Sequence, residues 1–250
     1  MGMNMGNQSR PELSVVILCY KAGDFVRSFV SLMKKTLEEN AIDSYELVLV
    51  ANYNKHEHDS DITHLVVKKI AEGDPKVRPV IKVKEGMMGW DMRSGLDAAT
   101  GEHIAIIDGD GQMPPQDIVR IYRALQTGNH DMAKTYREQR HDGPWRVLIS
   151  RVYNFLLKTL FPRVKVRDAN SKPKIFKREA LDKLKLTSDD WFIDAEIIIQ
   201  SSHLGFSIKE IDTVFFVNDQ RPSFIKIKAI LEFIKNLISY RFKDLSHLGK

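Results

Sequence analysis

Short runs of consecutive apolar residues alternate along the chain with longer stretches in which apolar residues recur every three or four positions. Four apolar runs predict buried strands: residues 13–19, 45–51, 78–82 and 104–107. Three stretches have the spacing of helices that are apolar on one face: residues 24–39, 61–71 and 90–99. Strands that are apolar throughout are typical of parallel sheets buried on both sides. We therefore expect an α/β fold with a mostly parallel central sheet and helices on both faces.

The chain has 250 residues, of which 43% are hydrophobic, and this is enough for one large core. We expect a disordered polar terminus over residues 1–10 and a single α/β domain over residues 11–220. No stretch approaches the ~20 consecutive apolar residues of a membrane-spanning helix, and the polar start lacks the apolar core of a signal peptide. An integral membrane protein is therefore not expected.

The last segment, residues 221–250, predicts a basic amphipathic helix that runs from about residue 222 to residue 245. Its apolar face consists of Ile230, Phe233, Ile234, Leu237, Ile238, Phe242 and Leu245. Lys226, Lys228 and Lys235 lie largely on the opposite face. Such a helix either covers the sheet or lies in the interface of a membrane, and the pattern leaves both open.

The net charge and the cysteine content limit which binding partners and which cellular compartment are expected for the protein. The net charge of +5 favours anionic partners such as phosphorylated metabolites, acidic membranes and nucleic acid. No zinc-finger spacing, helix-turn-helix or RNA-binding aromatic motif is present, so we do not expect nucleic acid as a partner. The single cysteine, Cys19, lies in an apolar run, which excludes an internal disulfide and favours a reducing compartment.

Two aspartates follow the apolar run that ends at Ile107. Asp108 and Asp110, with Gln112, place oxygen ligands around one point, and the glycines between them allow a sharp turn. Such ligands suit Mg²⁺ or Mn²⁺, shared with the phosphates of a substrate. A calcium-binding loop of the EF-hand type is excluded, because that loop needs Gly and Glu at the positions where this chain has Met113 and Val119. A solvated turn before a helix is the remaining alternative.

Six segments occur in a fixed order along the chain: residues 14–20, 89–102, 108–118, 150–154, 168–181 and 191–196. Together they resemble the family 2 inverting glycosyltransferases, which have a GT-A fold. The resemblance is greatest to the branch that makes polyprenyl-phosphate sugars such as dolichyl-phosphate mannose. The resemblance implies transfer of a sugar, with inversion, from a UDP or GDP sugar to a polyprenyl phosphate at the cytoplasmic surface of a membrane.

The resemblance also assigns the donor site. It places Asp108 near the nucleotide, gives Asp110 the metal that bridges the diphosphate, and uses Gln112 to complete the coordination. The nucleotide-binding residues that it implies are Tyr20, Lys21, Gly23, Asn52, Gly89, Arg93 and Asp108. A divalent cation suits this chemistry, because departure of a nucleoside diphosphate needs its developing charge neutralised.

An arginine-rich stretch follows the aspartates, with Arg137 and Arg146 among its members. Guanidinium groups bind phosphate in a bidentate geometry, so this stretch suits a phosphorylated acceptor. In the polyprenyl-phosphate branch, two arginines and a serine four residues after the second hold the lipid phosphate. Arg137, Arg146 and Ser150 match that pattern, although solvated surface charges would have the same composition.

The chain departs from the family at two places. Ala51 and Asn52 replace the usual acidic pair, and since an amide can both donate to and accept from uracil, Asn52 slightly favours UDP over GDP. Lys172, Pro173 and Lys174 stand where better-known members read Gly-Phe-Arg, which points to a subgroup with a different donor sugar or acceptor.

Asp194 matches the acidic residue near the family's reaction centre, and a carboxylate at the start of a helix is its alternative interpretation. Two other functions remain open: transfer to a sugar hydroxyl of a growing surface glycan, and a catalytically silent nucleotide-sugar-binding protein. A lipid phosphate attacks without losing a proton, whereas a hydroxyl needs a general base.

Overall fold

The computed structural model of the protein describes residues 10–58, 60–141, 143–217, 227–242 and 245. The expected disordered terminus therefore lies almost entirely outside the described residues. The strands are β1 (Leu13–Leu18), β2 (Tyr45–Val50), β3 (Val77–Val80), β4 (His103–Asp108), β5 (Met132–Arg140), β6 (Lys174–Lys177) and β7 (Ile208–Phe215). The α-helices are α1 (Phe25–Glu39), α2 (Thr63–Glu72), α3 (Met88–Ala98), α4 (Gln116–Thr127), α5 (Pro144–Leu160), α6 (Arg178–Leu181), α7 (Ile193–His203) and α8 (Ile227–Arg241).

The strands form one seven-stranded sheet in the order β3-β2-β1-β4-β6-β5-β7. The four strands from β3 to β4 are mutually parallel. Strand β6 runs antiparallel to both of its neighbours, and β5 and β7 pair in parallel. The expectation of a mostly parallel sheet is thus confirmed, and all six residues of β1, Ser14 included, are buried, as expected for this strand.

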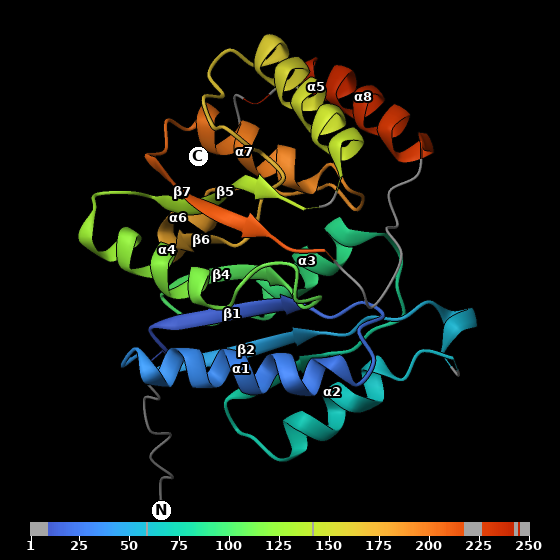
Figure 1. Ribbon diagram of the computed structural model, residues 1–250, viewed down its shortest axis with the longest axis vertical. Coiled ribbons are helices and arrows are strands. Elements are labelled where there is room, and N and C mark those ends of the chain that lie inside the picture. The colour runs from blue at the N-terminus through green and yellow to red at the C-terminus, as the bar shows by residue number, and fades with distance from the viewer. Residues whose placement is uncertain (1–9, 59, 142, 218–226, 243–244, 246–250) are drawn as a thin grey trace, which may run out of the picture.

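Helices cover the sheet on both faces, as expected (Figure 1). Alternate residues of β1 point to opposite sides, because successive side chains of a strand do so. Val15 and Ile17 belong to a core shared with α1, α2 and α4. Val16 and Leu18 belong to a second core shared with α3, α5, α7 and α8.

The register of the sheet brings three strand ends to one level. Leu18 at the end of β1 pairs with Val50 of β2 on one side and with Asp108 of β4 on the other. The residues that follow these strands therefore emerge together beyond the carboxyl edge of the sheet, which is where ligands bind in parallel α/β proteins.

The C-terminal helix α8 lies beside α5 (Figure 1). Leu237 is fully buried, and the hydroxyl of Tyr240 accepts a 2.9 Å hydrogen bond from Gln200 of α7. Ile238 and Phe242 remain 49% and 85% exposed. The helix thus covers part of the second core and also presents apolar side chains to the surface. None of the helices within the described ranges is long and apolar enough to cross a membrane.

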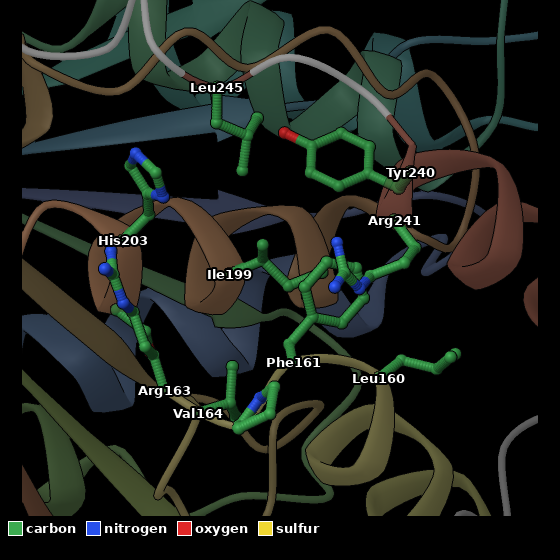
Figure 2. A pocket seen from close by; sticks show the side chains of 11 residues that line it. Leu160, Phe161, Arg163, Val164, Ile199, His203, Tyr240, Arg241 and Leu245 are labelled. Atoms are coloured by element: carbon green, nitrogen blue, oxygen red, sulfur yellow. The ribbon is translucent and has the colours of Figure 1, made fainter.

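A cavity of about 550 Å³ lies where α5, α7 and α8 end (Figure 2). Ile199 and Tyr240 contribute to its apolar lining, and Arg163, His203 and Arg241 also line it. It contacts Ile199 and His203 in the C-terminal half of α7, and its lining residues do not include those that directly follow β1, β2 and β4. The cavity is therefore separate from the site described next.

Candidate active site

The aspartate motif forms a tight turn at the end of β4. The backbone N–H of Gly109 donates to the Leu18 carbonyl at 2.9 Å, and a Cβ at Gly109 would lie 2.9 Å from Ile17 Cγ2. Gly111 has φ +74°, a conformation that favours glycine. Both glycines are therefore needed for this turn, as expected from the sequence, and the turn directs the motif across the end of β1.

The donor set of this turn fits a hard divalent cation. Asp108 and Asp110 supply carboxylate oxygens, and Gln112 supplies an amide oxygen. The Gln112 amide is held in place, because its Nε2 donates to the Phe216 carbonyl at 3.0 Å. Within the described part of the chain, no group of three or more His, Cys, Asp or Glu side chains could hold a metal ion. A hard divalent cation at this turn would thus need further oxygen ligands from outside these three residues.

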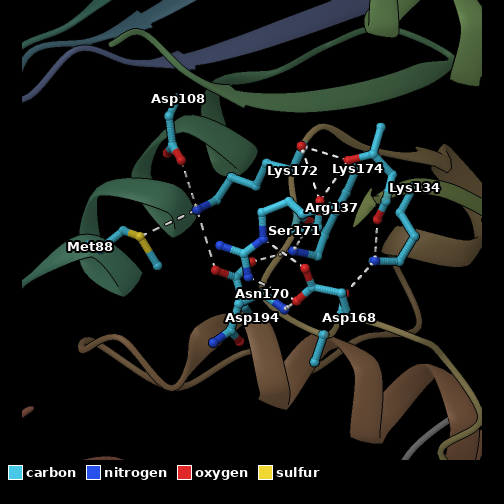
Figure 3. Close-up of polar contacts among 12 residues, drawn as sticks. Met88, Asp108, Lys134, Arg137, Asp168, Asn170, Ser171, Lys172, Lys174 and Asp194 are labelled. Atoms are coloured by element: carbon cyan, nitrogen blue, oxygen red, sulfur yellow. Dashed lines mark hydrogen bonds and ion pairs between the residues drawn. The ribbon is translucent and has the colours of Figure 1, made fainter. Parts of the chain in front are cut away.

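Lys172 joins the aspartate turn to helix α7 (Figure 3). Its Nζ lies 3.3 Å from Asp108 Oδ2 and 3.3 Å from Asp194 Oδ2, and its side chain is 4% exposed. Burial alone would lower the pKa of Lys172, but Asp108 and Asp194 raise it above its ordinary value. The ammonium therefore stays charged between the two carboxylates.

Asp194 is bound by a second buried lysine. Lys174 Nζ lies 2.5 Å from Asp194 Oδ1 and donates to the Ser171 carbonyl at 2.8 Å. Burial would raise the pKa of Asp194, but Lys172 and Lys174 hold it below its ordinary value. Burial lowers the pKa of Lys174 to about 8, despite Asp194. Both oxygens of Asp194 are thus neutralised by cations, which is unlike the environment of a general base.

Asp194 and the nearby Glu196 serve different neighbours, because residues 193–203 are helical. The Glu196 carboxylate accepts hydrogen bonds of 2.8–3.0 Å from the backbone of Thr187 and Ser188 and from the Thr187 hydroxyl. Asp194 instead faces the lysines. Asp194 thus lies in the first turn of α7, as its alternative interpretation in the sequence analysis had it.

Arg137 of β5 is engaged by an aspartate. Its Nε and one terminal nitrogen donate to the two oxygens of Asp168 at 2.7 and 2.9 Å. The fully buried Lys134 donates to the Asp168 carbonyl at 2.6 Å and lies 3.4 Å from Glu210. Burial lowers the pKa of Lys134. The bidentate geometry expected of Arg137 is therefore present, with a carboxylate of the protein as its partner.

Arg146 and Ser150 lie one turn apart near the start of α5 and are both half-buried. Residues four apart share a helix face, so these two side chains project to the same side. The Ser150 carbonyl accepts a hydrogen bond from Asn154 Nδ2 at 2.8 Å. The pair thus shares a face, as the arginine–serine pattern requires.

Asn52 lies just beyond the end of β2, and both the nitrogen and the oxygen of its side-chain amide form hydrogen bonds within the protein. Its Nδ2 donates to Asp91 at 3.0 Å and its Oδ1 accepts from the Lys82 backbone at 2.9 Å. Lys84 forms a buried ion pair with Asp91 and lies 4.0 Å above the centre of the Tyr20 ring. Burial raises the pKa of Asp91 despite Lys84. In this geometry the Asn52 amide positions Asp91, and the slight preference for UDP stays a prediction.

The loop after β1 contains two left-handed residues, Lys21 at φ 55° and Gly23 at φ 54°. The Gly23 N–H donates to the Thr63 hydroxyl at 2.9 Å, which fixes the loop against α2. Lys21 Nζ lies 5.4 Å from the Tyr20 ring centre. The residues assigned to the nucleotide on this strand are therefore held in one ordered turn.

Gly89 and Arg93 tie α3 to the loop before α7. A Cβ at Gly89 would lie 2.4 Å from the Ser188 carbonyl oxygen and 2.6 Å from that of Asp190. Arg93 pairs with Asp189 of the same loop, and its buried Nε has no hydrogen-bond partner among the described residues. Gly89 is thus needed for close packing between two backbones.

The sequence did not identify several residues that the structure places here. Asp91 and Lys84 form an ion pair beneath Tyr20, and Asp168 holds Arg137. Lys134 interrupts the apolar start of β5, and a lysine in such a run was the one available signal of a buried polar network. The other contacts join segments that are distant in sequence.

An α/β sheet with an aspartate turn at its carboxyl edge is compatible with a nucleotide-diphosphate-sugar transferase, and the comparisons with known proteins identify the class. The model of the family described as "Glycosyl transferase family 2" matches residues 14–185, and the chain belongs to this family. It is 24% identical over 254 residues to human "Dolichyl-phosphate beta-glucosyltransferase", covering 94% of this chain and 76% of that protein. The chain is therefore a glycosyltransferase.

Two further similarities add detail. Over 118 residues the chain is 31% identical to "Dodecaprenyl-phosphate galacturonate synthase" of Rhizobium johnstonii, a match of 46% of this chain and 35% of that protein. Among solved structures, glucosyl-3-phosphoglycerate synthase from Mycobacterium tuberculosis with Mn²⁺, uridine diphosphate and phosphoglyceric acid superposes with a TM-score of 0.70 at 19% identity. That superposition covers 96% of this chain and 82% of the other. It confirms the GT-A fold.

Proposed function

We propose that the protein transfers a sugar, with inversion, from a nucleotide-diphosphate sugar to a polyprenyl phosphate at a membrane surface. The observation that carries this proposal is the environment of Asp194, whose two oxygens are neutralised by Lys172 and Lys174. A carboxylate held by two ammonium groups is a poor proton acceptor. A phosphate acceptor is already anionic and needs no such base.

In the proposed reaction, a phosphate oxygen of the acceptor attacks the anomeric carbon. The bond from that carbon to the donor's diphosphate breaks, and the nucleoside diphosphate leaves with the electron pair. Asp108, Asp110 and Gln112 would hold Mg²⁺ or Mn²⁺, which when bound supplies positive charge to the leaving diphosphate. No proton has to move in this step.

We assign the other residues of the site by where they lie in the structure. Tyr20, Lys21 and Gly23 form the turn beyond β1 that would contact the nucleoside, with Asn52 behind it through Asp91. Gly89 and Arg93 would shape the opposite wall of the same site. We assign Arg146, Ser150 and Arg137 to the acceptor phosphate, with Arg137 exchanging part of its contact with Asp168 for that phosphate.

The relatives support the acceptor class, since the names of two of them contain a polyprenyl phosphate, dolichyl-phosphate in one and dodecaprenyl-phosphate in the other. Transfer to a sugar hydroxyl is the competing reaction, and it requires a general base. The two reactions therefore differ in how strongly turnover depends on Asp194.

Steady-state kinetics of Arg146→Ala and Asp194→Asn test the proposal. With a polyprenyl-phosphate acceptor, Arg146→Ala should raise the acceptor KM by about tenfold or more, because a charge-assisted phosphate contact is lost. Asp194→Asn should lower kcat only modestly. A loss of about a thousandfold in kcat for Asp194→Asn, beside a normal KM for Arg146→Ala, would contradict the proposal and favour a hydroxyl acceptor.

A further inference from the structure

Lys172 places a permanent positive charge at the junction of the aspartate turn and helix α7. Its Nζ is 3.3 Å from a carboxylate oxygen of Asp108 and 3.3 Å from one of Asp194. The side chain is almost fully buried, at 4% exposure. The resemblance described in the sequence analysis implies glycine at this position, so the charge of Lys172 is a departure from the pattern that it implies.

The third contact of the ammonium is weak. A lysine ammonium has three N–H donors, and the next polar atom beside Lys172 Nζ is the Met88 sulfur at 3.4 Å. A thioether is a poor acceptor compared with a phosphate oxygen. Met88 begins helix α3, which also carries Gly89 and Arg93. The ammonium therefore has capacity for an anionic oxygen that enters between α3 and the aspartate turn.

The Lys172 ammonium would repel a metal ion bound at Asp108. Asp108 is one of the oxygen ligands of the aspartate turn, and Lys172 already occupies its Oδ2. A divalent cation at this carboxylate would either displace the ammonium or lie close to it, and like charges repel. An incoming diphosphate would relieve that repulsion, because its negative charge attracts both cations.

Lys174 does not provide an equivalent charge. Its Nζ binds Asp194 Oδ1 and the Ser171 carbonyl, and its side chain has no exposure. It thus lies behind Asp194, whereas Lys172 lies between Asp194 and Asp108. Of these two lysines, only Lys172 contacts a residue of the aspartate turn among the contacts described.

We propose that Lys172 is a built-in cation of the donor site, which binds an oxygen of the donor's diphosphate and competes with the divalent metal for Asp108. This inference rests on the proposed function, because it takes the donor to be a nucleoside-diphosphate sugar. It makes Lys172 a binding residue for the leaving group, in a position where the resemblance assigned no role.

Calorimetric titrations of Lys172→Met test the inference without any turnover. Mn²⁺ is titrated into the protein without nucleotide, and UDP or GDP, whichever the wild type binds, is titrated in EDTA. Removal of a positive charge should strengthen Mn²⁺ binding and weaken nucleotide binding, each by about tenfold. Lys172→Arg is the matched control, because it keeps the charge and should leave both affinities within about threefold of the wild type.

The two affinities are expected to change in opposite directions. The test therefore distinguishes an effect of the Lys172 charge from a purely structural role of its side chain. If Lys172 only holds the loop together, the Met variant should lose affinity for both ligands, and that result would overturn the inference. Unchanged affinities would overturn it as well. Thermal unfolding monitors folding, and Lys172→Gln replaces the Met variant if the latter does not fold. Failure of the donor assignment within the proposed function looks different, since the wild type would then bind neither nucleotide in the presence of Mn²⁺. Failure of the acceptor assignment would leave these affinities unchanged and show only in the kinetics of Arg146→Ala and Asp194→Asn.

Discussion

At the scale of single residues, the site is governed by the pairing of buried charges. Asp194, Lys172 and Lys174 are each less than a tenth exposed, and each charge has an opposite charge within 3.3 Å. A buried charge is tolerated when it is paired, whereas removal of one partner leaves the other uncompensated. The two lysines and the aspartate therefore stabilise the fold and set the chemistry of the site together.

Asp194→Asn should lower the free energy of unfolding by about 3–5 kcal/mol near neutral pH, because two buried ammonium groups lose their carboxylate. The pKa of Asp194 lies below its ordinary value, so its contribution is present above pH ~3.9 and is lost as the pH falls through the folded-state pKa. The gap between variant and wild type should therefore narrow below about pH 4.

Urea unfolding at several pH values between about 3 and 7 measures this gap. Asp182→Asn is the control, since Asp182 is 62% exposed and its removal should cost less than about 1 kcal/mol. Equal stability of wild type and Asp194→Asn near neutral pH would contradict the account.

Residues adjacent in sequence were the predictable part of the site. The aspartates, their glycines and the strand before them are contiguous, so their turn could be expected from the sequence. The pairing of Lys172 with Asp108 joins residues 64 positions apart, and that of Asn52 with Asp91 joins residues 39 apart. No local pattern encodes such contacts. This is why the sequence left the roles of Lys172 and Asp91 undefined.

At the scale of elements, helix α3 is the part that joins the core to the site. A Cβ at Gly95 would lie 2.4 Å from Val16 Cγ1 and 2.7 Å from Val50 Cγ2, so the helix packs directly on β1 and β2. Gly89, at the other end, packs on the backbone before α7. The same helix thus has one glycine in the core and one at the site.

Two glycine variants should separate these functions of α3. Gly95→Ala overpacks the core and should cost about 1–3 kcal/mol of stability, with little change in nucleotide affinity. Gly89→Ala should displace the loop at residues 188–190 and weaken nucleotide binding by about tenfold or more. Urea unfolding and calorimetry measure the two quantities. A normal nucleotide affinity for Gly89→Ala would exclude this end of α3 from the donor site.

Helices and strands were predictable from the sequence where apolar residues recur in a regular pattern, and their boundaries were less predictable. The first three strands expected from apolar runs appear within one or two residues of their predicted ends. The antiparallel strand β6 was not separately predicted. Two of its four residues are lysines, so it lacks the apolar run that would predict a strand. Lys174 is nevertheless buried, because it pairs with Asp194. Tertiary charge pairing thus outweighed local polarity in this strand.

At the scale of the whole molecule, exposed apolar side chains gather on two neighbouring helices. Trp145, Leu148, Val152 and Phe155 of α5 are between 48% and 70% exposed and recur at helical spacing. Phe242, which directly follows α8, is 85% exposed, and Arg241 at the end of that helix is exposed as well. Apolar and basic groups together favour contact with acidic lipid, so we propose that this end of the domain lies on the membrane.

The double variant Trp145→Ala/Phe155→Ala should reduce co-sedimentation with acidic liposomes by severalfold and leave nucleotide binding unchanged. Point variants are preferable to deletion of α8, because Leu237 and Tyr240 belong to the core. Leu65→Ala on α2, with a parent side chain that is 56% exposed, is the matched control and should bind liposomes as the wild type does. Equal sedimentation of all three proteins would contradict the proposed membrane surface.

The most direct test of the account is transfer of labelled sugar from UDP and GDP sugars to a short-chain polyprenyl phosphate. We predict a product that is extractable into organic solvent, that forms only with Mg²⁺ or Mn²⁺, and that Asp110→Ala does not make. Labelled sugar that appears only on a hydroxyl-bearing glycan, with none on the lipid phosphate, would contradict the proposed acceptor.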